Sequence, residues 1–243
     1  MLSTVTPLAE KARGNRYPMT ALWYALGGVL GGVTLGAVMA GLAVLVGAIG
    51  LDLSASLAIL AVAALVSAGS DARVGGWQVP GSRSQVNELW LNWYRSWVYG
   101  LGFGWQIGTG VVTYLMTAGV YLLIVAGALT GNPLLALAGG VVFGAVRGIA
   151  VLAGAGLNSQ ARLNRFHRRF ETLRRPVEVI TILFLVATAI LAAAATGGRV
   201  FLVATVLAAS CVTWVTLRHR AADGQILSDG AMVGTYDTSA KTG

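Results

Sequence analysis

The feature that most constrains this chain is a series of six apolar tracts that carry almost no charge. They cover residues 19–49, 53–68, 97–129, 133–157, 177–195 and 200–217. A run of about 20 apolar residues is long enough to cross a bilayer as a helix. Only 11% of the chain is charged, whereas a soluble domain usually has about 25%. We therefore expect an all-α polytopic membrane protein with six transmembrane helices. A soluble enzyme, a disordered protein and a disulfide scaffold are excluded.

The connections between the tracts alternate between very short and long. Residues 50–52, 130–132 and 196–199 form short connections that contain Gly and Asn, which tolerate turn geometry. A tight turn brings two successive helices together as an antiparallel pair. The six helices are therefore expected to form three hairpins.

The expected domain organisation has three parts. A membrane domain covers residues 19–217 and contains two longer connectors, at about 69–96 and 158–176. A cytoplasmic segment, 1–18, precedes it. The tail, 218–243, is rich in Gly, Ser, Thr and Asp without apolar periodicity, so we expect it to be disordered and dispensable.

The basic residues give the orientation of the chain. Fifteen of the seventeen lysines and arginines fall in the two termini and the two long connectors, while the short turns contain only Arg199 and one tract contains Arg147. Cytoplasmic segments carry such an excess. We therefore expect a multi-pass protein of the cell membrane, with both termini and a basic face in the cytoplasm. The net charge of +8 then reflects this bias and attraction to anionic lipid headgroups, not nucleic-acid binding.

Cysteine and histidine are too scarce for several kinds of chemistry. One cysteine, Cys211, cannot form an internal disulfide or a cysteine metal cage. The two histidines, His167 and His219, lie near tract ends without metal-ligand spacing. No HExxH or GxSxG motif is present. We expect no enzyme activity, no metal and no cofactor.

A basic connector at residues 162–175 has an amphipathic pattern. Phe166, Phe170 and Leu173 recur at spacings of four and three, which predicts a short helix on the inner leaflet. Its arginines, including Arg165, Arg168 and Arg169, serve either as a topological anchor or as contacts for an anionic lipid or an acidic cytoplasmic partner. Pro176 fits the first turn of the next helix.

Tryptophans concentrate in the other connector. Trp90, Trp93 and Trp97 recur on one face of a helix within residues 84–99, and tryptophan favours the headgroup region. The pattern predicts an interfacial helix that contacts lipid or a partner and bends into the third tract near Gly100. An aromatic cage for a cationic ligand is the alternative.

Glycines form three stripes at four-residue spacing. They are Gly28, Gly32 and Gly36; Gly100, Gly104 and Gly108; and Gly140, Gly144 and Gly148. Small residues at this spacing let helix backbones approach closely. The stripes therefore predict helix–helix contacts without any ligand.

Arg147 is the one charge deep within a tract, where an unpaired charge is costly. Its expected partner is Gln106, Glu178 or a bound anion, and Asn158 is a weaker candidate. Two interpretations remain open, a structural pair and a solute site. The residues expected to line that site are Arg147, Gln106, Thr109, Thr113 and Thr34.

Six short-looped tracts with glycine-rich openings at Gly27–Gly32 and Gly100–Gly104 resemble the LysE/CcdA-type superfamily of small membrane proteins. That resemblance implies an exporter or a thiol-electron carrier. Electron carriers of this type place a reactive cysteine in each half, whereas this chain has only Cys211, so disulfide relay is not carried over. We expect a small secondary transporter or exporter of a small, anionic solute. The alternative is a non-transporting anchor or assembly factor that holds a partner through its basic face; the oligomeric state stays open.

Overall fold

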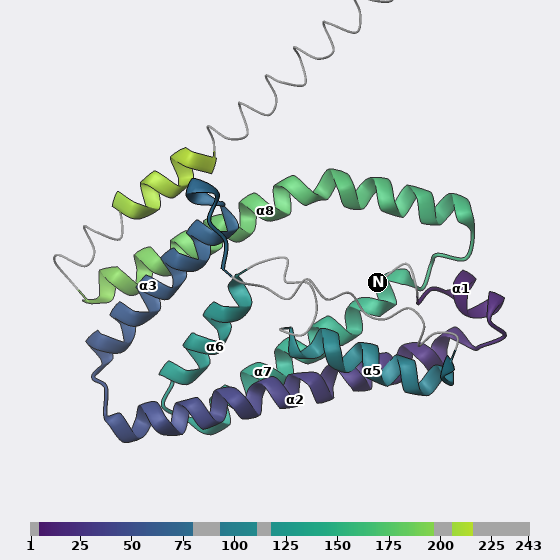
Figure 1. The fold of residues 1–243 in the computed structure, drawn as a ribbon, viewed down its shortest axis with the longest axis horizontal. Coiled ribbons are helices and arrows are strands. Elements are labelled where there is room, and N and C mark those ends of the chain that lie inside the picture. Colours follow the sequence, from purple (N-terminus) through teal and green to yellow (C-terminus); the bar gives the residue numbers. More distant parts are fainter. Residues whose placement is uncertain (1–4, 80–92, 111–117, 197–205, 216–243) are drawn as a thin grey trace, which may run out of the picture.

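The computed structural model describes residues 5–79, 93–110, 118–196 and 206–215 (Figure 1). Within these ranges every regular element is a helix and none is a strand, which confirms the all-α fold class. The elements are α1 (Pro7–Ala12), α2 (Tyr17–Ile49), α3 (Leu53–Asp71), η1 (Val74–Gly76), α5 (Ser96–Thr109), α6 (Gly119–Leu129), α7 (Pro133–Ile149), η2 (Ala150–Gly154) and α8 (Gln160–Thr196).

Four helices are long and apolar enough to cross a membrane. They are Tyr17–Ile49, Leu53–Asp71, Pro133–Gly154 and Arg175–Thr196. The third of these is α7 together with η2, and the fourth is the apolar half of α8. Two apolar helices, Gly119–Leu129 and Val206–Val215, are shorter. The expected tail at residues 218–243 lies outside the described residues.

Two of the three expected turns lie in described segments, and local chemistry explains them. Gly50 ends α2 with φ +70°, a left-handed conformation that glycine adopts without a Cβ clash. Asp52 then accepts a hydrogen bond from the Ala55 N–H, 3.2 Å away, and caps α3. Asn132 caps α7 in the same way, with Pro133 in its first turn. The third turn falls partly at residues outside the described ranges.

Helix α2 packs between α5 and α7 at backbone contact distance. Gly28, Gly32 and Gly36 face α7, and a Cβ on Gly32 would lie 2.5 Å from the Gly140 carbonyl oxygen. Gly27 and Gly31 face α5, where a Cβ would overlap backbone atoms of Leu101 or Trp105. Adjacent glycines of α2 therefore contact two different helices. The predicted close helix–helix contacts are confirmed.

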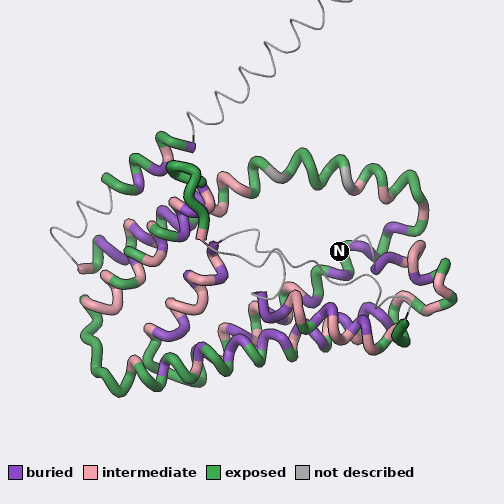
Figure 2. The backbone as a smooth tube through the Cα atoms, viewed as in Figure 1, coloured by how far each residue is buried: buried purple, intermediate pink, exposed green. Residues whose placement is uncertain are grey.

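A second group of helices is built around α3 and α8 and meets α2 through α6. Its core joins apolar residues of α3, α8 and the helix at 206–215 to Leu122 of α6, and it includes Cys211. Figure 2 shows buried positions along this contact and along the line where α2, α5 and α7 meet. Helix α6 links the two groups because it also packs against α2 through Leu123 and Ile124.

The third tract, expected as one helix from 97 to 129, is instead interrupted. Helix α5 ends at Thr109, Gly110 follows with φ +70°, and α6 begins at Gly119. A left-handed residue cannot continue a right-handed helix, so the chain leaves the axis of α5 at Gly110. The bend expected near Gly100 is also wrong, because α5 begins at Ser96 and runs through that position.

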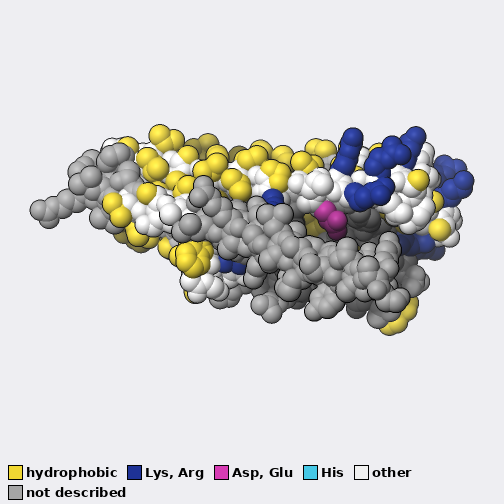
Figure 3. All heavy atoms as spheres, turned by 90° about the horizontal axis from the view of Figure 1, so that it is seen from above, with side chains coloured by type: hydrophobic (Ala, Val, Ile, Leu, Met, Phe, Trp, Pro, Cys, Tyr) yellow, Lys and Arg dark blue, Asp and Glu magenta, His cyan; other side chains and the backbone are white. Residues whose placement is uncertain are grey.

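Helix α8 joins the basic connector to the apolar tract without interruption. Pro176, expected in a first turn, instead lies inside this 37-residue helix, where it removes one backbone donor. The first half of α8 is exposed along most of its length (Figure 2). Figure 3, which looks onto α8, shows Lys and Arg side chains gathered at one end of the molecule.

The glycine contacts of α2 can be tested with a matched pair of variants. Gly32→Ala places a methyl group against the α7 backbone and should destabilise the protein by about 1–3 kcal/mol. Gly41→Ala lies in the same helix with nothing within 4 Å of its Cβ. It should be neutral or stabilise by up to about 1 kcal/mol. Thermal unfolding of both variants in one detergent checks this, and equal shifts would contradict the proposed packing.

Candidate functional site

The end of α5 is held by an arginine from α7. The last carbonyls of a helix lack helical partners and carry partial negative charge. Arg147 Nε donates a hydrogen bond to the Ile107 carbonyl, 2.8 Å away, and the Gly110 N–H donates to the same oxygen over 3.1 Å. The guanidinium therefore caps the terminus that Gly110 creates.

An aromatic ring fills the space at this bend. The Arg147 guanidinium carbon lies 5.3 Å from the centroid of the Phe143 ring, a distance at which a cation is attracted to the ring face. A Cβ on Gly110 would lie 2.9 Å from Cε1 of the same ring. Glycine at position 110 thus supplies both the left-handed turn and the room for Phe143.

The start of α6 is held by a residue of opposite charge. The Ala118 N–H, at the N-cap of α6, donates to Asp71 Oδ1 over 2.7 Å. A carboxylate is favourable at a helix N-terminus, as a cation is at a C-terminus. Each end of the interruption between α5 and α6 therefore meets a charged side chain from a neighbouring helix.

The residues expected to line a solute site lie in different places around this interruption. Gln106 is half-buried in the last turn of α5, and the buried Thr109 hydroxyl donates to the Gln106 carbonyl over 2.8 Å. Thr34 lies on α2, where it donates to the Leu30 carbonyl and accepts a bond from Trp105 Nε1. Thr113 lies outside the described residues.

The acceptor that Arg147 uses differs from the two side chains expected for it. Among the described residues, its hydrogen bond goes to the Ile107 backbone and not to the side chain of Gln106 or Glu178. Every residue has a backbone carbonyl. The sequence alone therefore does not show which carbonyl lies at a helix end and is free to accept a bond from an arginine. The position of that end depends on Gly110, one glycine among 33.

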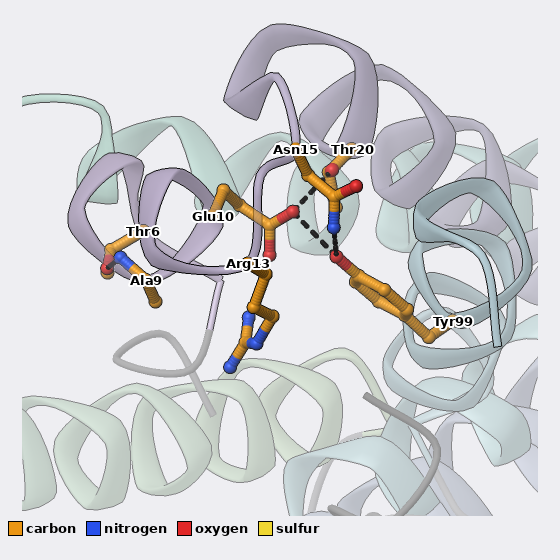
Figure 4. Close-up of polar contacts among 7 residues, drawn as sticks. All are labelled: Thr6, Ala9, Glu10, Arg13, Asn15, Thr20 and Tyr99. Atoms are coloured by element: carbon orange, nitrogen blue, oxygen red, sulfur yellow. Dashed lines mark hydrogen bonds and ion pairs between the residues drawn. The ribbon is translucent and has the colours of Figure 1, made fainter. Parts of the chain in front are cut away.

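A second polar cluster was missed by sequence analysis (Figure 4). Glu10 of α1 is fully buried. Its Oε1 accepts from Arg13 Nη1 over 2.8 Å, and its Oε2 accepts from the Thr20 hydroxyl over 2.8 Å and the Tyr99 hydroxyl over 2.6 Å. Asn15 Nδ2 donates to the Tyr99 oxygen over 3.0 Å. One carboxylate thus joins α1 to the first turns of α2 and α5.

Apolar and polar contacts around the Glu10 cluster seat the N-terminal segment on the bundle. Val5 is buried with Tyr24, Phe103 and Val151. The Tyr17 hydroxyl donates to the Val151 carbonyl over 2.8 Å. Residues 5–18, expected as a cytoplasmic segment outside the membrane domain, therefore pack against it. The only sequence signal was an acidic residue four positions after a Thr-Pro helix start.

The residues expected to contact lipid or a partner are exposed where the structure describes them. Arg165, Arg168 and Arg169 lie on the open half of α8. Trp93 is 74% exposed and Trp97 is 46% exposed; the Trp97 ring also packs at a tilt against Trp23 of α2, with 6.0 Å between ring centroids. Trp90 lies outside the described residues.

Neither metal ligation nor similarity to known proteins adds a candidate. Among residues 5–79, 93–110, 118–196 and 206–215, no group of three His, Cys, Asp or Glu side chains could hold a metal ion. The chain matches no protein-family model, no curated protein and no solved structure. Within the described part of the chain, the interrupted helix and the Glu10 cluster are the two polar arrangements considered below.

The capping role of Arg147 predicts a graded response to substitution. Arg147→Met removes a charge-assisted hydrogen bond and should cost about 1.5–3 kcal/mol of stability. Arg147→Lys should lose less, because an ammonium still donates to a carbonyl although the planar fork is gone. Arg168→Met, on the open face of α8, is the control and should shift stability by less than about 0.5 kcal/mol. Thermal unfolding measures the stability of each variant. Equal stability losses in Arg147→Met and Arg168→Met would contradict the capping role of Arg147.

Proposed function

We propose that this chain is a six-span membrane protein that moves a small anionic solute past the interruption between α5 and α6. Transporter sites are commonly formed by discontinuous helices whose ends lie near the middle of the membrane domain. A helix end inside a membrane domain is tolerated where protein or a water-filled cavity satisfies its backbone groups. The interruption, with Arg147 on one helix end and Asp71 on the other, is the observation that carries this proposal.

The choice of an anionic solute rests on the donors at the interruption. A guanidinium has five N–H donors, and the bond to Ile107 uses one of them, at Nε. Gln106 adds a side-chain amide on the same turn of α5. A small anion that reaches this place would be bound by charge and by directional donors, while the Phe143 ring packs against the guanidinium.

Solute binding is tested by thermal stabilisation of purified protein with phosphate, sulfate, short carboxylates and amino acids. A ligand that binds only the folded state raises its stability by about 2.7 kcal/mol at 100 times its Kd. Gln106→Leu should remove this gain and also the uptake of the same solute into reconstituted vesicles. Arg168→Met should leave both unchanged. Full stabilisation and uptake in Gln106→Leu would place the solute elsewhere.

The proposed orientation puts the basic end of the molecule in the cytoplasm. Its support is the gathering of Lys and Arg at one end (Figure 3) together with the positive-inside rule. Reporter fusions after residues 52, 132 and 198 should report the outside, and fusions after residues 83, 169 and 243 the inside. An outside signal after residue 169 would overturn the topology, because it would expose the basic half of α8.

A second candidate function rests on that basic half. In this alternative the protein is an anchor or assembly factor whose exposed arginines hold an anionic lipid surface or an acidic partner. The Phe166 and Phe170 rings lie 5.4 Å apart on α8, and Phe170 and Leu173 are about half exposed. An apolar stripe flanked by arginines is typical of interfacial helices.

Lipid composition separates the two candidates. Charge reversal of Arg165, Arg168 and Arg169 to Glu should lower stability in bilayers that contain anionic lipid, by roughly 1 kcal/mol for each charge near the surface. The same variant should behave like wild type in zwitterionic bilayers. Solute uptake that survives this reversal supports transport as the primary function, whereas loss of partner binding without any solute effect supports the anchor.

A further inference from the structure

Tyr24 of α2 carries a buried hydroxyl without a hydrogen-bond partner. The residue is 3% exposed, and within the part of the chain that the structure describes its hydroxyl neither donates nor accepts a bond. Two other tyrosines pack in the same apolar cluster, and both are partnered: Tyr17 donates to the Val151 carbonyl and Tyr99 donates to Glu10. A buried hydroxyl left unpaired costs stability. Such a group in a folded protein therefore points to a role outside the fold itself.

The Tyr24 ring lies beside the arginine that caps α5. Ile107, whose carbonyl accepts the Arg147 bond, packs against the cluster that contains Tyr24 and Val151. Val151 follows Arg147 in the chain by about one helical turn. The Tyr24 phenol and the Arg147 guanidinium are close enough to interact electrostatically, although no hydrogen bond joins these two side chains in the described structure.

Most donors of the Arg147 guanidinium are also unused. Its Nε–H bonds the Ile107 carbonyl, while the four hydrogens on Nη1 and Nη2 have no acceptor among the described residues. Arg147 is the one Lys or Arg in residues 17–72 and 96–161, so its charge has no nearby competitor for an anion. The pair of Nη atoms presents a planar edge, and this edge matches the two oxygens of a carboxylate.

We propose that Arg147 and Tyr24 form a subsite for one carboxylate group, whose oxygens accept bonds from the Arg147 Nη hydrogens and from the Tyr24 hydroxyl. This subsite rests on the proposed function, because it names the class of solute that binds at the interruption. One guanidinium balances one negative charge. Asp71, at the start of α6, already adds a negative charge there, and an unbalanced buried charge is costly. Monocarboxylates therefore bind more tightly than sulfate or hydrogen phosphate.

Two tyrosine variants test the state of the Tyr24 hydroxyl in solute-free protein. Tyr24→Phe removes a hydroxyl that has no partner, so the unfolding temperature should stay the same or rise. Tyr99→Phe is the matched control. It loses the bond to Glu10 and the bond from Asn15, so its unfolding temperature should fall. An equal fall in both variants would show that the Tyr24 hydroxyl is already bonded within the protein, which overturns the subsite.

Carboxylate binding is measured by thermal unfolding of the purified full-length protein with acetate and propionate, against sulfate and hydrogen phosphate at equal ionic strength. A ligand of the folded state raises the unfolding temperature, and the concentration dependence gives an apparent Kd. For the wild type, this Kd should be lower for the monocarboxylates than for the dianions. Tyr24→Phe should raise the carboxylate Kd about tenfold or more, because a hydrogen bond to a charged group is lost. Tyr99→Phe should keep the wild-type Kd.

Uptake into reconstituted vesicles separates the subsite from transport. Carboxylate binding that weakens in Tyr24→Phe, without uptake of that carboxylate by the wild type, supports the subsite and contradicts transport. Uptake that is lost in Gln106→Leu, together with an unchanged carboxylate Kd in Tyr24→Phe, overturns the subsite and leaves the transport proposal in place. A wild type that binds the dianions as tightly as the carboxylates, or binds none of these anions, also overturns the subsite.

Discussion

The architecture depends on backbone contact between α2 and two neighbours at once. Glycines at successive positions turn toward different helices: Gly27 and Gly31 meet α5, and Gly28 and Gly32 meet α7. Between apolar helices in lipid there is no hydrophobic driving force for association. Close packing and hydrogen bonds must therefore hold the helices together. The double contact aligns α5 and α7 on α2. It thereby brings Arg147 of α7 to the end of α5, so the polar site follows from the glycine packing.

Three charged residues of this chain stabilise helix ends and the junctions between helices. Arg147 serves the C-terminus of α5, Asp71 the N-terminus of α6, and Glu10 the first turns of α2 and α5. In each case a charged side chain bonds a polar group of another element. That group is a backbone carbonyl, a backbone N–H or a hydroxyl without a partner in its own helix. Such groups are expensive to leave unmatched in an apolar medium.

Local patterns in the sequence predicted the helical class, the turns at residues 50–52 and 130–132, and the glycine contacts, because each depends on residue type and spacing. The interruption after Thr109 was not predicted, since Gly110 resembles the many helical glycines around it. The continuity of α8 through Pro176 was missed because proline usually marks a boundary. The burial of Glu10 requires Thr20 and Tyr99, which are 10 and 89 residues away in the chain. No local pattern records such a contact.

The arrangement of α2 also sets an order for biosynthesis. Its glycine faces are made early, but Gly108 of α5 and Gly148 of α7, which cover Gly28, follow about 80 and 120 residues later. At a translation rate of about 5–20 residues per second, α2 spends roughly 6–24 s without its α7 partner. In the folded protein, α3 packs on α6, α8 and the helix at 206–215 and does not cover these glycine faces. For most of that interval both glycine faces of α2 remain without the helices that cover them in the folded protein.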